Sequence, residues 1–446
     1  SACLVGSEMC IRDSPRACPM AQPLIWLQEL QLLTGPGEPP GRGDALIADD
    51  GTLLALGAAA AERGRCAGLQ PRACLQGWLA PALVDPHSVL EDPLSGRAET
   101  LGSLVAAVSS GGYGTLALLP WSSPWRDCPE RLVLPPQAPV HVHLWGSFSR
   151  GGGDAELAPH GDQLEAGAIG LAGGDHAPPV ALLERALRLG EMAAAPLLLA
   201  PRDPSLSGGG FVREGADALR AGWPADPALS ETLPLQGLLA LAAVHKPPAL
   251  RLMNLSTAEG AALLAQLPAG TRPLASVSWW HLLADAARLD PTAEGWRLVP
   301  SLGTPADREG LIAALRDGVL AAVAVHHLAL DAEERLLPLD QRRGGLAGHG
   351  PVLPLLWQEL VEHRGWSPQE LWQALCWGPA AFLGLKAPSL DAGHRQWLVF
   401  DPTAPWRPGG SALAANQPDP ALWLPPERRS GAIRASGLMP AASWTL

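Results

Sequence analysis

Short apolar runs broken by turn residues open and close the chain. Between residues 20 and 75 the runs LIWLQELQLL and ALIADDGTLLALG flank a Gly/Pro-rich stretch, and the Asp-Asp-Gly within the second run is typical of a β-hairpin. After residue 385 the run RQWLVFDP returns to strand-type sequence before a Pro-rich, weakly patterned tail. Both ends have β character and flank a longer central segment. We therefore expect residues 20–75 and 386–446 to form one composite β domain.

From residue 76 to residue 385, strand-type apolar runs alternate with stretches that have a helical period. The runs are TLALLP, PVHVHLWG, GAIGLAG, APLLLAP, ALRLMNLS, PLASVSW, WRLVPS and AVAVHHL. Helices are expected over residues 99–110, 179–194 and 257–267. About eight such repeats predict an α/β fold, a parallel (β/α)8 TIM barrel, whose chemistry lies at the C-terminal ends of the strands.

The first nineteen residues differ from the rest. Residues 3–14, CLVGSEMCIRDS, can be encoded by a nucleotide string that resembles the adapter of transposon-based sequencing libraries. We therefore expect residues 1–19 to be a non-native, adapter-derived leader, with the native start near Met20. A signal peptide is the rival interpretation, but Glu8, Arg12 and Asp13 interrupt any apolar core.

Composition and charge exclude several classes of partner. The formal net charge is −12, from 32 basic and 44 acidic residues, and no Lys/Arg run occurs, so we expect neither nucleic acid nor an anionic membrane as a partner. No stretch of about 18 apolar residues without charges predicts a transmembrane span. The seven cysteines form no Cys-x-x-Cys pair, and their odd number in a long chain predicts a reducing, cytoplasmic compartment.

The first motif with chemical meaning is LVDPHSVLEDP, which follows the apolar run GWLAPALV. It resembles the first barrel strand of metal-dependent amidohydrolases, which ends in His-x-His. Other segments extend the likeness in the same order, namely SSGGYGTLALLP, LAPHGDQLEAGAIG, RDPSLSGGG, NLSTAEGAALL, DREGLIAALRDGV, GGLAGHGPVLPLL and LWQALCWGPAAFLGL. From residue 24 to about residue 406, the chain resembles the dihydroorotase family of the amidohydrolase superfamily.

The resemblance implies a site with two zinc ions that share a hydroxide, while an aspartate transfers the proton. Of the six family positions, only that of His87 keeps its ligand. The second His of the first strand is replaced by Val89, the bridging acid by Gly173, the third and fourth His by Ala200 and Asn254, and the catalytic Asp by His326. We therefore expect no catalytic residue and no zinc cofactor.

The positions that bind substrate in the family have changed as well. The arginine that pairs with the orotate carboxylate is replaced by Glu91, so an anionic substrate would meet a carboxylate. An asparagine is replaced by Trp121, and the later Asn-Pro-Pro-Leu-Arg becomes VPSLG, with Val299 and Gly303 at its two ends. We expect Trp121, Trp279 and Trp280 to fill the old pocket, of which His327 and Asp203 are possible remnants.

A rebuilt zinc site is the alternative to this loss. His141 and His143 alternate on one face near the end of a strand, and His87, His326 and His327 could converge at the barrel mouth. Three neutral imidazoles can bind zinc. Against this, isolated strand histidines are more often hydrogen-bonded neighbours than metal ligands. By the same reasoning, RDPSLS at residues 202–207 is foremost an ordinary helix start.

The resemblance to the non-catalytic branch of this family suggests a role. Such chains in some bacteria assemble with aspartate carbamoyltransferase, so we expect a pseudoenzyme of pyrimidine biosynthesis in a homo- or hetero-oligomer. Its contact surface should lie on barrel helices or the β domain, away from His87. Two alternatives stay open: an active cyclic-amide hydrolase of the dihydroorotase or hydantoinase type with a rearranged metal site, and a pocket that binds a pyrimidine metabolite without turnover.

Overall fold

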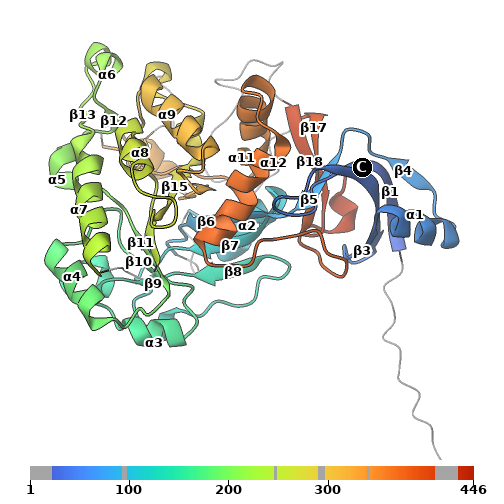
Figure 1. The fold of residues 1–446 in the computed structure, drawn as a ribbon, viewed down its shortest axis with the longest axis horizontal. Coiled ribbons are helices and arrows are strands. Elements are labelled where there is room, and N and C mark those ends of the chain that lie inside the picture. Colours follow the sequence, from blue (N-terminus) through green and yellow to red (C-terminus); the bar gives the residue numbers. More distant parts are fainter. Residues whose placement is uncertain (1–22, 93–97, 246–248, 290–296, 339–340, 407–429) are drawn as a thin grey trace, which may run out of the picture.

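The computed structural model shows a barrel with a β-rich part at one end, where the first and last segments of the chain lie together (Figure 1). The residues it describes are 23–92, 98–245, 249–289, 297–338, 341–406 and 430–446. The expected leader, residues 1–19, lies outside these ranges. Within them, no helix is long and apolar enough to cross a membrane.

One sheet combines strands from both ends of the chain. Its order is β18-β17-β5-β1-β2-β3, and β4 also pairs with β1. Because β17 pairs antiparallel with β5, the last part of the chain joins the first. β5 lies within the range that we assigned to the barrel. The strands are β1 (Pro23–Leu32), β2 (Gly41–Ala48), β3 (Leu53–Leu56), β4 (Pro71–Ala73), β5 (Trp78–Pro81), β17 (Trp397–Pro405) and β18 (Ser430–Ser436).

Local chemistry explains the turns and the packing of this sheet. The predicted hairpin joins β2 and β3, where the Asp50 carboxylate accepts a hydrogen bond from the Thr52 amide at 2.8 Å and Gly51 has a φ of 87°. Leu27 and Val399 are buried in the core of this sheet. The Trp397 indole donates to the Gly51 carbonyl at 2.9 Å, which ties the two ends together.

The central segment forms the predicted (β/α)8 barrel. Neighbouring strands pair in parallel, and β8 with β9 fills one position of the ring. The ring closes between its last and first strands, where the Val325 amide donates to Asp85 Oδ1 at 3.0 Å. The strands are β6 (Leu83–Ser88), β7 (Tyr113–Leu118), β8 (His141–Leu144), β9 (Gly146–Ser147), β10 (Leu171–Ala172), β11 (Pro196–Leu199), β14 (Ala249–Leu252), β15 (Leu274–Ser278) and β16 (Ala322–Ala324).

Helices surround this ring, and threonine side chains cap several of them. The Thr100, Thr257 and Thr304 hydroxyls accept hydrogen bonds from backbone amides of the first helical turn. A small strand pair, β12 (Val212–Arg213) with β13 (Ala225–Asp226), interrupts the run between β11 and β14. The helices are α1 (Gly57–Cys66), α2 (Leu101–Ser110), α3 (His160–Glu165), α4 (Val180–Leu189), α5 (Pro204–Ser207), α6 (Ala216–Ala221), α7 (Leu229–His245), α8 (Ala258–Ala265), α9 (Pro305–Arg316), α10 (Ala332–Arg335), α11 (Val352–Leu356), α12 (Pro368–Trp372) and α13 (Gly378–Phe382).

The predicted elements match this arrangement with one correction. The three predicted helices correspond to α2, α4 and α8, each somewhat shorter than expected. The run WRLVPS is not a barrel strand, because residues 297–301 form no strand. Apolar character there reflects packing of a loop, in which Leu298 and Ser301 are buried. The strand that completes the ring is β6.

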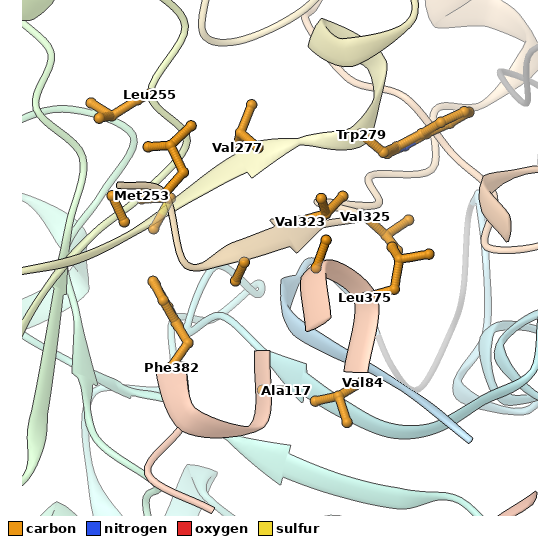
Figure 2. Close-up of a cluster of buried hydrophobic side chains, with 14 of the residues drawn as sticks. Val84, Ala117, Met253, Leu255, Val277, Trp279, Val323, Val325, Leu375 and Phe382 are labelled. Atoms are coloured by element: carbon orange, nitrogen blue, oxygen red, sulfur yellow. The ribbon is translucent and has the colours of Figure 1, made fainter. Parts of the chain in front are cut away.

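Apolar side chains fill the barrel interior. Figure 2 shows Val84, Ala117, Val277 and Val323, which come from four different strands, gathered with Phe382 in one buried cluster. Burial of branched aliphatic side chains from alternate strands is the usual way in which such a barrel is closed and packed. The interior is therefore solid, and any site lies above it at the strand ends.

Candidate functional site

The C-terminal ends of the barrel strands surround a small, partly open cavity of about 20 Å³. A cavity of this size holds about one water molecule. Several positions that the sequence singled out meet here, together with charged residues that it did not. The lining residues are Trp121, Asp175, Ala200, Pro201, Arg202, Glu231, Met253, Asn254, Val299, Pro300 and His326.

His87 is fully buried at the end of β6, and both of its ring nitrogens contact protein groups. Its Nδ1 lies 3.0 Å from Nδ1 of His326, and its Nε2 lies 2.8 Å from the Ser276 hydroxyl. Burial, with His326 as a further cause, holds the pKa of His87 well below its usual value. His87 is therefore a neutral ring whose lone pair and proton are both used within the protein.

His326, which the resemblance aligns with the family's catalytic aspartate, has a left-handed backbone, with a φ of 48°. Its ring meets His87 and Trp121 edge to face, at centroid distances of 5.1 and 5.7 Å. Burial lowers the pKa of His326 to about 4. The Trp121 indole donates to the Gly173 carbonyl at 2.9 Å, so an aromatic ring lies against the position of the bridging acid.

Asn254, which the resemblance aligns with the family's fourth histidine, lines the cavity beside Ala200 and Val299. Its backbone is left-handed, with a φ of 49°, and its amide N–H donates to the Ser276 hydroxyl at 3.0 Å. Among the described residues, neither atom of its side-chain amide has a hydrogen-bond partner. Asn tolerates this backbone conformation better than most residues, which gives the position a conformational reason for its identity.

Val89 and Gly303 serve packing. Val89 is buried, and its amide donates to the His327 carbonyl at 2.8 Å, which strengthens the closure between the first and last strands. A Cβ on Gly303 would lie 2.7 Å from Cβ of Asp307 and 3.2 Å from the Ser256 carbonyl, so no larger residue fits without movement. Neither position offers a group that could bind substrate.

Glu91 is paired with a cation. Its carboxylate accepts hydrogen bonds from both terminal nitrogens of Arg343, one of them at 2.8 Å, and Arg343 also reaches Glu334 at 3.4 Å. These groups line a second pocket, of about 210 Å³. The charge reversal at Glu91 is thus balanced by an arginine from a distant segment, which the sequence interpretation did not anticipate.

His327 and Asp203, the two expected pocket remnants, do not line the small cavity. His327 Nε2 lies 2.6 Å from Glu99 Oε2, and its Nδ1 accepts from the Gly348 amide at 2.8 Å. Asp203 caps α5, where its carboxylate accepts from the Ser205 amide at 2.9 Å. Asp203 lines a different groove, between α4 and α7.

The residues present do not fit a zinc centre. The positions that the resemblance aligns with family ligands offer no suitable donor at Val89, Gly173 and Ala200, and both ring nitrogens of His87 contact protein groups. His141 and His143 are the first and third residues of β8, and neither lines the small cavity. In the described part of the chain, no group of three His, Cys, Asp or Glu side chains could hold a metal ion.

The three tryptophans expected to fill the pocket lie at different places relative to the small cavity. Trp121 lines the cavity, whereas Trp279 and Trp280 are fully buried and pack edge to face, 5.0 Å apart. Figure 2 places Trp279 beside the hydrophobic cluster, beyond the end of β15. Only Trp121 therefore borders the cavity, and the other two extend the core.

Sequence reasoning missed the charged residues around the cavity. Arg202 donates to the Asp175 carboxylate at 2.8 Å, and His176 lies 3.2 Å from Asp154 and 2.9 Å from Asp175. These two carboxylates raise the pKa of His176 to about 9. Asp175 follows directly on the GLAGG run that carried the bridging-acid position, which is the one signal that could have drawn attention to it.

Glu231 is the most heavily bonded of the missed residues. It is buried in α7, and its carboxylate accepts from the backbone amides of Ser256 and Thr257, at 2.8 and 3.1 Å, and from both hydroxyls, at 2.5 Å. The buried Arg213 lies 3.4 Å from the same carboxylate and 3.1 Å from Asp226. This network fixes the loop after β14 that carries Asn254.

Comparison with solved structures supports the fold. A D-hydantoinase has a TM-score of 0.72 at 15% identity, covering 94% of this chain and 96% of that chain. An L-hydantoinase (dihydropyrimidinase) from Arthrobacter aurescens has a TM-score of 0.69 at 15% identity, covering 92% and 94%. At such identities the likeness shows the fold alone, which is the amidohydrolase type of barrel with a composite β domain.

Sequence relatives make the assignment more specific, although no family model matches. A probable dihydroorotase-like protein from Synechocystis sp. is 35% identical over 363 residues, 74% of this chain and 81% of the relative. A dihydroorotase-like protein from Pseudomonas aeruginosa is 29% identical over 85% of this chain and 90% of its own length, and a dihydroorotase from Syntrophobacter fumaroxidans is 28% identical over 72% and 75%. The chain belongs to the dihydroorotase family of the amidohydrolase superfamily.

Proposed function

We propose that this chain is a catalytically inactive, dihydroorotase-like protein of pyrimidine biosynthesis that serves as a structural partner of aspartate carbamoyltransferase in the cytoplasm. The observation that carries the proposal is the state of His87. It is the only ligand retained from the family set, and both of its nitrogens are engaged by His326 and Ser276. A residue in that state cannot also present a lone pair to a cation.

The chemistry of ring opening supports the same proposal. Hydrolysis of a cyclic amide in this family needs a metal-bound hydroxide, a polarised carbonyl and a carboxylate that transfers the proton. Val89, Gly173 and Ala200 offer no ligand for the metal that would supply the first two, and His326 stands at the position aligned with the carboxylate. The cavity of about 20 Å³ is also far too small for a pyrimidine ring, which argues against a metabolite bound there.

A role in assembly follows from what is kept. Function resides in sites placed on folds. A barrel that keeps its scaffold and loses its catalytic site can still act through its surface. The Glu231 network holds the NLSTAEG segment without help from a metal. The family resemblance supplies the partner, a carbamoyltransferase whose structure such chains support.

The first test addresses inactivity. Purified protein should contain no stoichiometric zinc by elemental analysis, and should neither cyclise carbamoyl aspartate nor open dihydroorotate. Two metal ions per chain together with turnover would reject the proposal in favour of an active cyclic-amide hydrolase with a rearranged site. A sample refolded or grown with added zinc serves as the control for metal lost during purification.

The second test addresses the partner. The chain should be co-expressed with the aspartate carbamoyltransferase of the same genome and the mixture analysed by size-exclusion chromatography with mass measurement. Co-elution at micromolar concentration is expected, with loss of carbamoyltransferase stability when this chain is omitted. Separate elution of a stable, active carbamoyltransferase would reject the scaffold role.

A further inference from the structure

A groove of about 430 Å³ lies between α4 and α7. These two helices contact each other at the outer edge of the barrel, at the end far from the sheet formed by β17 and β18 (Figure 1). Small-molecule sites typically enclose about 300–1,000 Å³, so the groove has room for a small organic molecule. It is distinct from the small cavity at the strand ends, although Arg202 lines both.

Most of the groove lining is apolar. Leu183 of α4 and Leu238 of α7 are buried, so they form its base, whereas Val180 and Leu233, 62% and 54% exposed, lie at its edges. Gly237 of α7 also lines the groove, and a Cβ added there would meet no atom within 4 Å, so the space beside it is open. These walls suit a hydrocarbon group, because contact with them removes apolar surface from water.

Charged residues line the rest of the groove. We call them the charged end: Asp154, His176, Arg202 and Asp203. They come from the segments that follow β9, β10 and β11. They are linked, because His176 lies 3.2 Å from Asp154, and Asp175 contacts both His176 and Arg202, at 2.9 and 2.8 Å. An apolar wall with a few polar groups gathered together is the usual form of a site for a small molecule.

The charges around this end nearly cancel, with one carboxylate in excess. The carboxylates of Asp154 and Asp175 both contact His176 and raise its pKa to about 9, so this imidazole is protonated at neutral pH. His176 and Arg202 together balance these two carboxylates. Asp203 is the third carboxylate, and its hydrogen bonds within the described structure come from the uncharged groups of Ser205.

Asp203 and Arg202 each keep capacity for a further partner. Asp203 accepts from the Ser205 amide and hydroxyl, at 2.9 and 2.6 Å, and both bonds end on Oδ1, so Oδ2 is left for another donor. The bond from Arg202 to Asp175 uses one of the several N–H groups that a guanidinium carries. The charged end can therefore receive an ammonium group at Asp203 and a carboxylate at Arg202, and these two residues are neighbours in the chain.

We propose that the groove binds an apolar α-amino acid in its zwitterionic form. The ammonium group binds the Asp203 carboxylate, the α-carboxylate binds the Arg202 guanidinium, and the side chain packs against Leu183 and Leu238. Both polar contacts are charge-assisted hydrogen bonds, which are stronger than neutral ones. A ligand with a single charge would use only one of the two partners, and a ligand without hydrocarbon would leave the apolar walls in water. The inference goes beyond the proposed function, since it holds whether or not the chain binds a carbamoyltransferase.

The first experiment titrates the full-length chain with L-phenylalanine in a calorimeter, and with L-leucine as a second apolar amino acid. Saturable binding of one molecule per chain is expected. Hydrocinnamate lacks the ammonium group, phenethylamine lacks the carboxylate, and glycine lacks the side chain. Each of these three probes should therefore bind at least about tenfold more weakly than phenylalanine. A chain that binds neither amino acid, or that binds any of the three probes as tightly, would overturn the proposal.

A matched pair of variants locates the site. Gly237→Leu fills the open space beside α7 and should weaken the binding of phenylalanine at least about tenfold. Gly161→Leu makes the same change on α3, where an added Cβ also meets no atom within 4 Å, and should bind as the parent does. Leucine favours a helix more than glycine does, so neither change should unfold the chain. Equal binding by the two variants would overturn the assignment of the groove.

A third variant tests the charge without filling space. Asp203→Asn removes the carboxylate but keeps the cap of α5, because asparagine also caps helices. It should weaken the binding of phenylalanine at least about tenfold, and it should not weaken the binding of hydrocinnamate, which has no ammonium group. Parent-like affinity of Asp203→Asn for phenylalanine would show that no ammonium group binds there and would overturn the proposal.

Discussion

Two polar regions at the barrel mouth, one around Glu231 and one around Asn254, have opposite characters. Around Glu231, every acceptor is used, with five donors from Ser256, Thr257 and Arg213 directed at one carboxylate. Around Asn254, in the described structure, the side-chain amide has no partner. The first region holds the loop in place, and the second borders a cavity with room for about one water molecule.

The difference shows which residues of an enzyme fold are independent of its chemistry. The Glu231 network stabilises the barrel through protein hydrogen bonds alone, so it does not depend on a metal. The positions that the family resemblance aligns with metal ligands, such as Val89 and Asn254, carry residues that suit packing or backbone conformation. Losses of stability should therefore be large in the first region and small in the second.

The largest effect is expected from Glu231→Gln. The substitution keeps the shape but turns one acceptor oxygen into a donor that faces the Ser256 and Thr257 amides, and it leaves the buried Arg213 with less compensation. Breaking such a buried network costs about 3–5 kcal/mol, measurable as a lower free energy of unfolding in urea. Glu259→Gln, an exposed change on α8, should stay within about 0.5 kcal/mol of the parent. Equal losses of unfolding free energy for Glu231→Gln and Glu259→Gln would contradict a special structural role of the Glu231 network.

The next effect depends on pH. The pKa values of His281 and His326 are held at about 4 by burial, below the usual value near 6.5, so the unfolded chain binds protons that the folded chain does not. Between pH 6.5 and 4 the free energy of unfolding should therefore fall with falling pH, by about 1.4 kcal/mol per pH unit for each histidine. His326→Asn suits the left-handed backbone and should remove one of these two contributions, about 2 kcal/mol at pH 5.

Titration must be separated from lost packing in that variant. The difference between parent and His326→Asn at pH 8 reports the packing of the ring, because both forms are then neutral. Only the change of this difference between pH 8 and pH 5 belongs to the proton. A difference that is constant over this range would show that His326 titrates normally.

A smaller effect is expected at Asn254. Asn254→Gly removes an amide that has no partner in the described structure and keeps a backbone conformation that glycine adopts freely, so the free energy of unfolding should change by less than about 1 kcal/mol. Asn254→Val should cost more, about 1–2 kcal/mol, because a β-branched residue is strained at a φ of 49°. If Asn254→Gly lowers the free energy of unfolding by more than Asn254→Val, the side-chain amide contributes to stability, and a bound water or ligand must form its hydrogen bonds.

No gain of function is expected from Val89→His. It restores one histidine, but the bridging position at Gly173 still lacks an oxygen and His87 is still bonded to Ser276. Elemental analysis should show no added zinc, and dihydroorotate should stay intact. Uptake of one zinc per chain by this variant would mean that the site is closer to function than its geometry suggests.

The fold was largely readable from the sequence, because period and turn chemistry are local. The Asp50–Gly51 hairpin and the β/α alternation depend on neighbours in the chain, and both were predicted correctly. The strand prediction for WRLVPS was wrong for the same reason. Its apolar residues have the local pattern of a strand, but the surrounding fold packs them as a loop.

The site was less readable, because it depends on side-chain direction and on distant partners. His326 and His327 are adjacent, yet one contacts His87 and the other turns to Glu99. No local pattern distinguishes them. Likewise, the Arg343 that balances Glu91 is 252 residues away along the chain. The resemblance to the family predicts which ligands are replaced, but it cannot identify a compensating residue from elsewhere in the chain.

Because the sheet contains strands from both ends of the chain, it can be completed only late in synthesis. The hydrogen bond from the Trp397 indole to the Gly51 carbonyl can form only after 346 more residues have been synthesised. The pairing of β5 with β17 is delayed in the same way. At the usual speed of a ribosome, this delay is roughly 20–70 s. During that time the N-terminal strands stand with an unpaired edge, which is prone to pair with other chains. A chain that lacks the last strands would leave the edge of β5 unpaired.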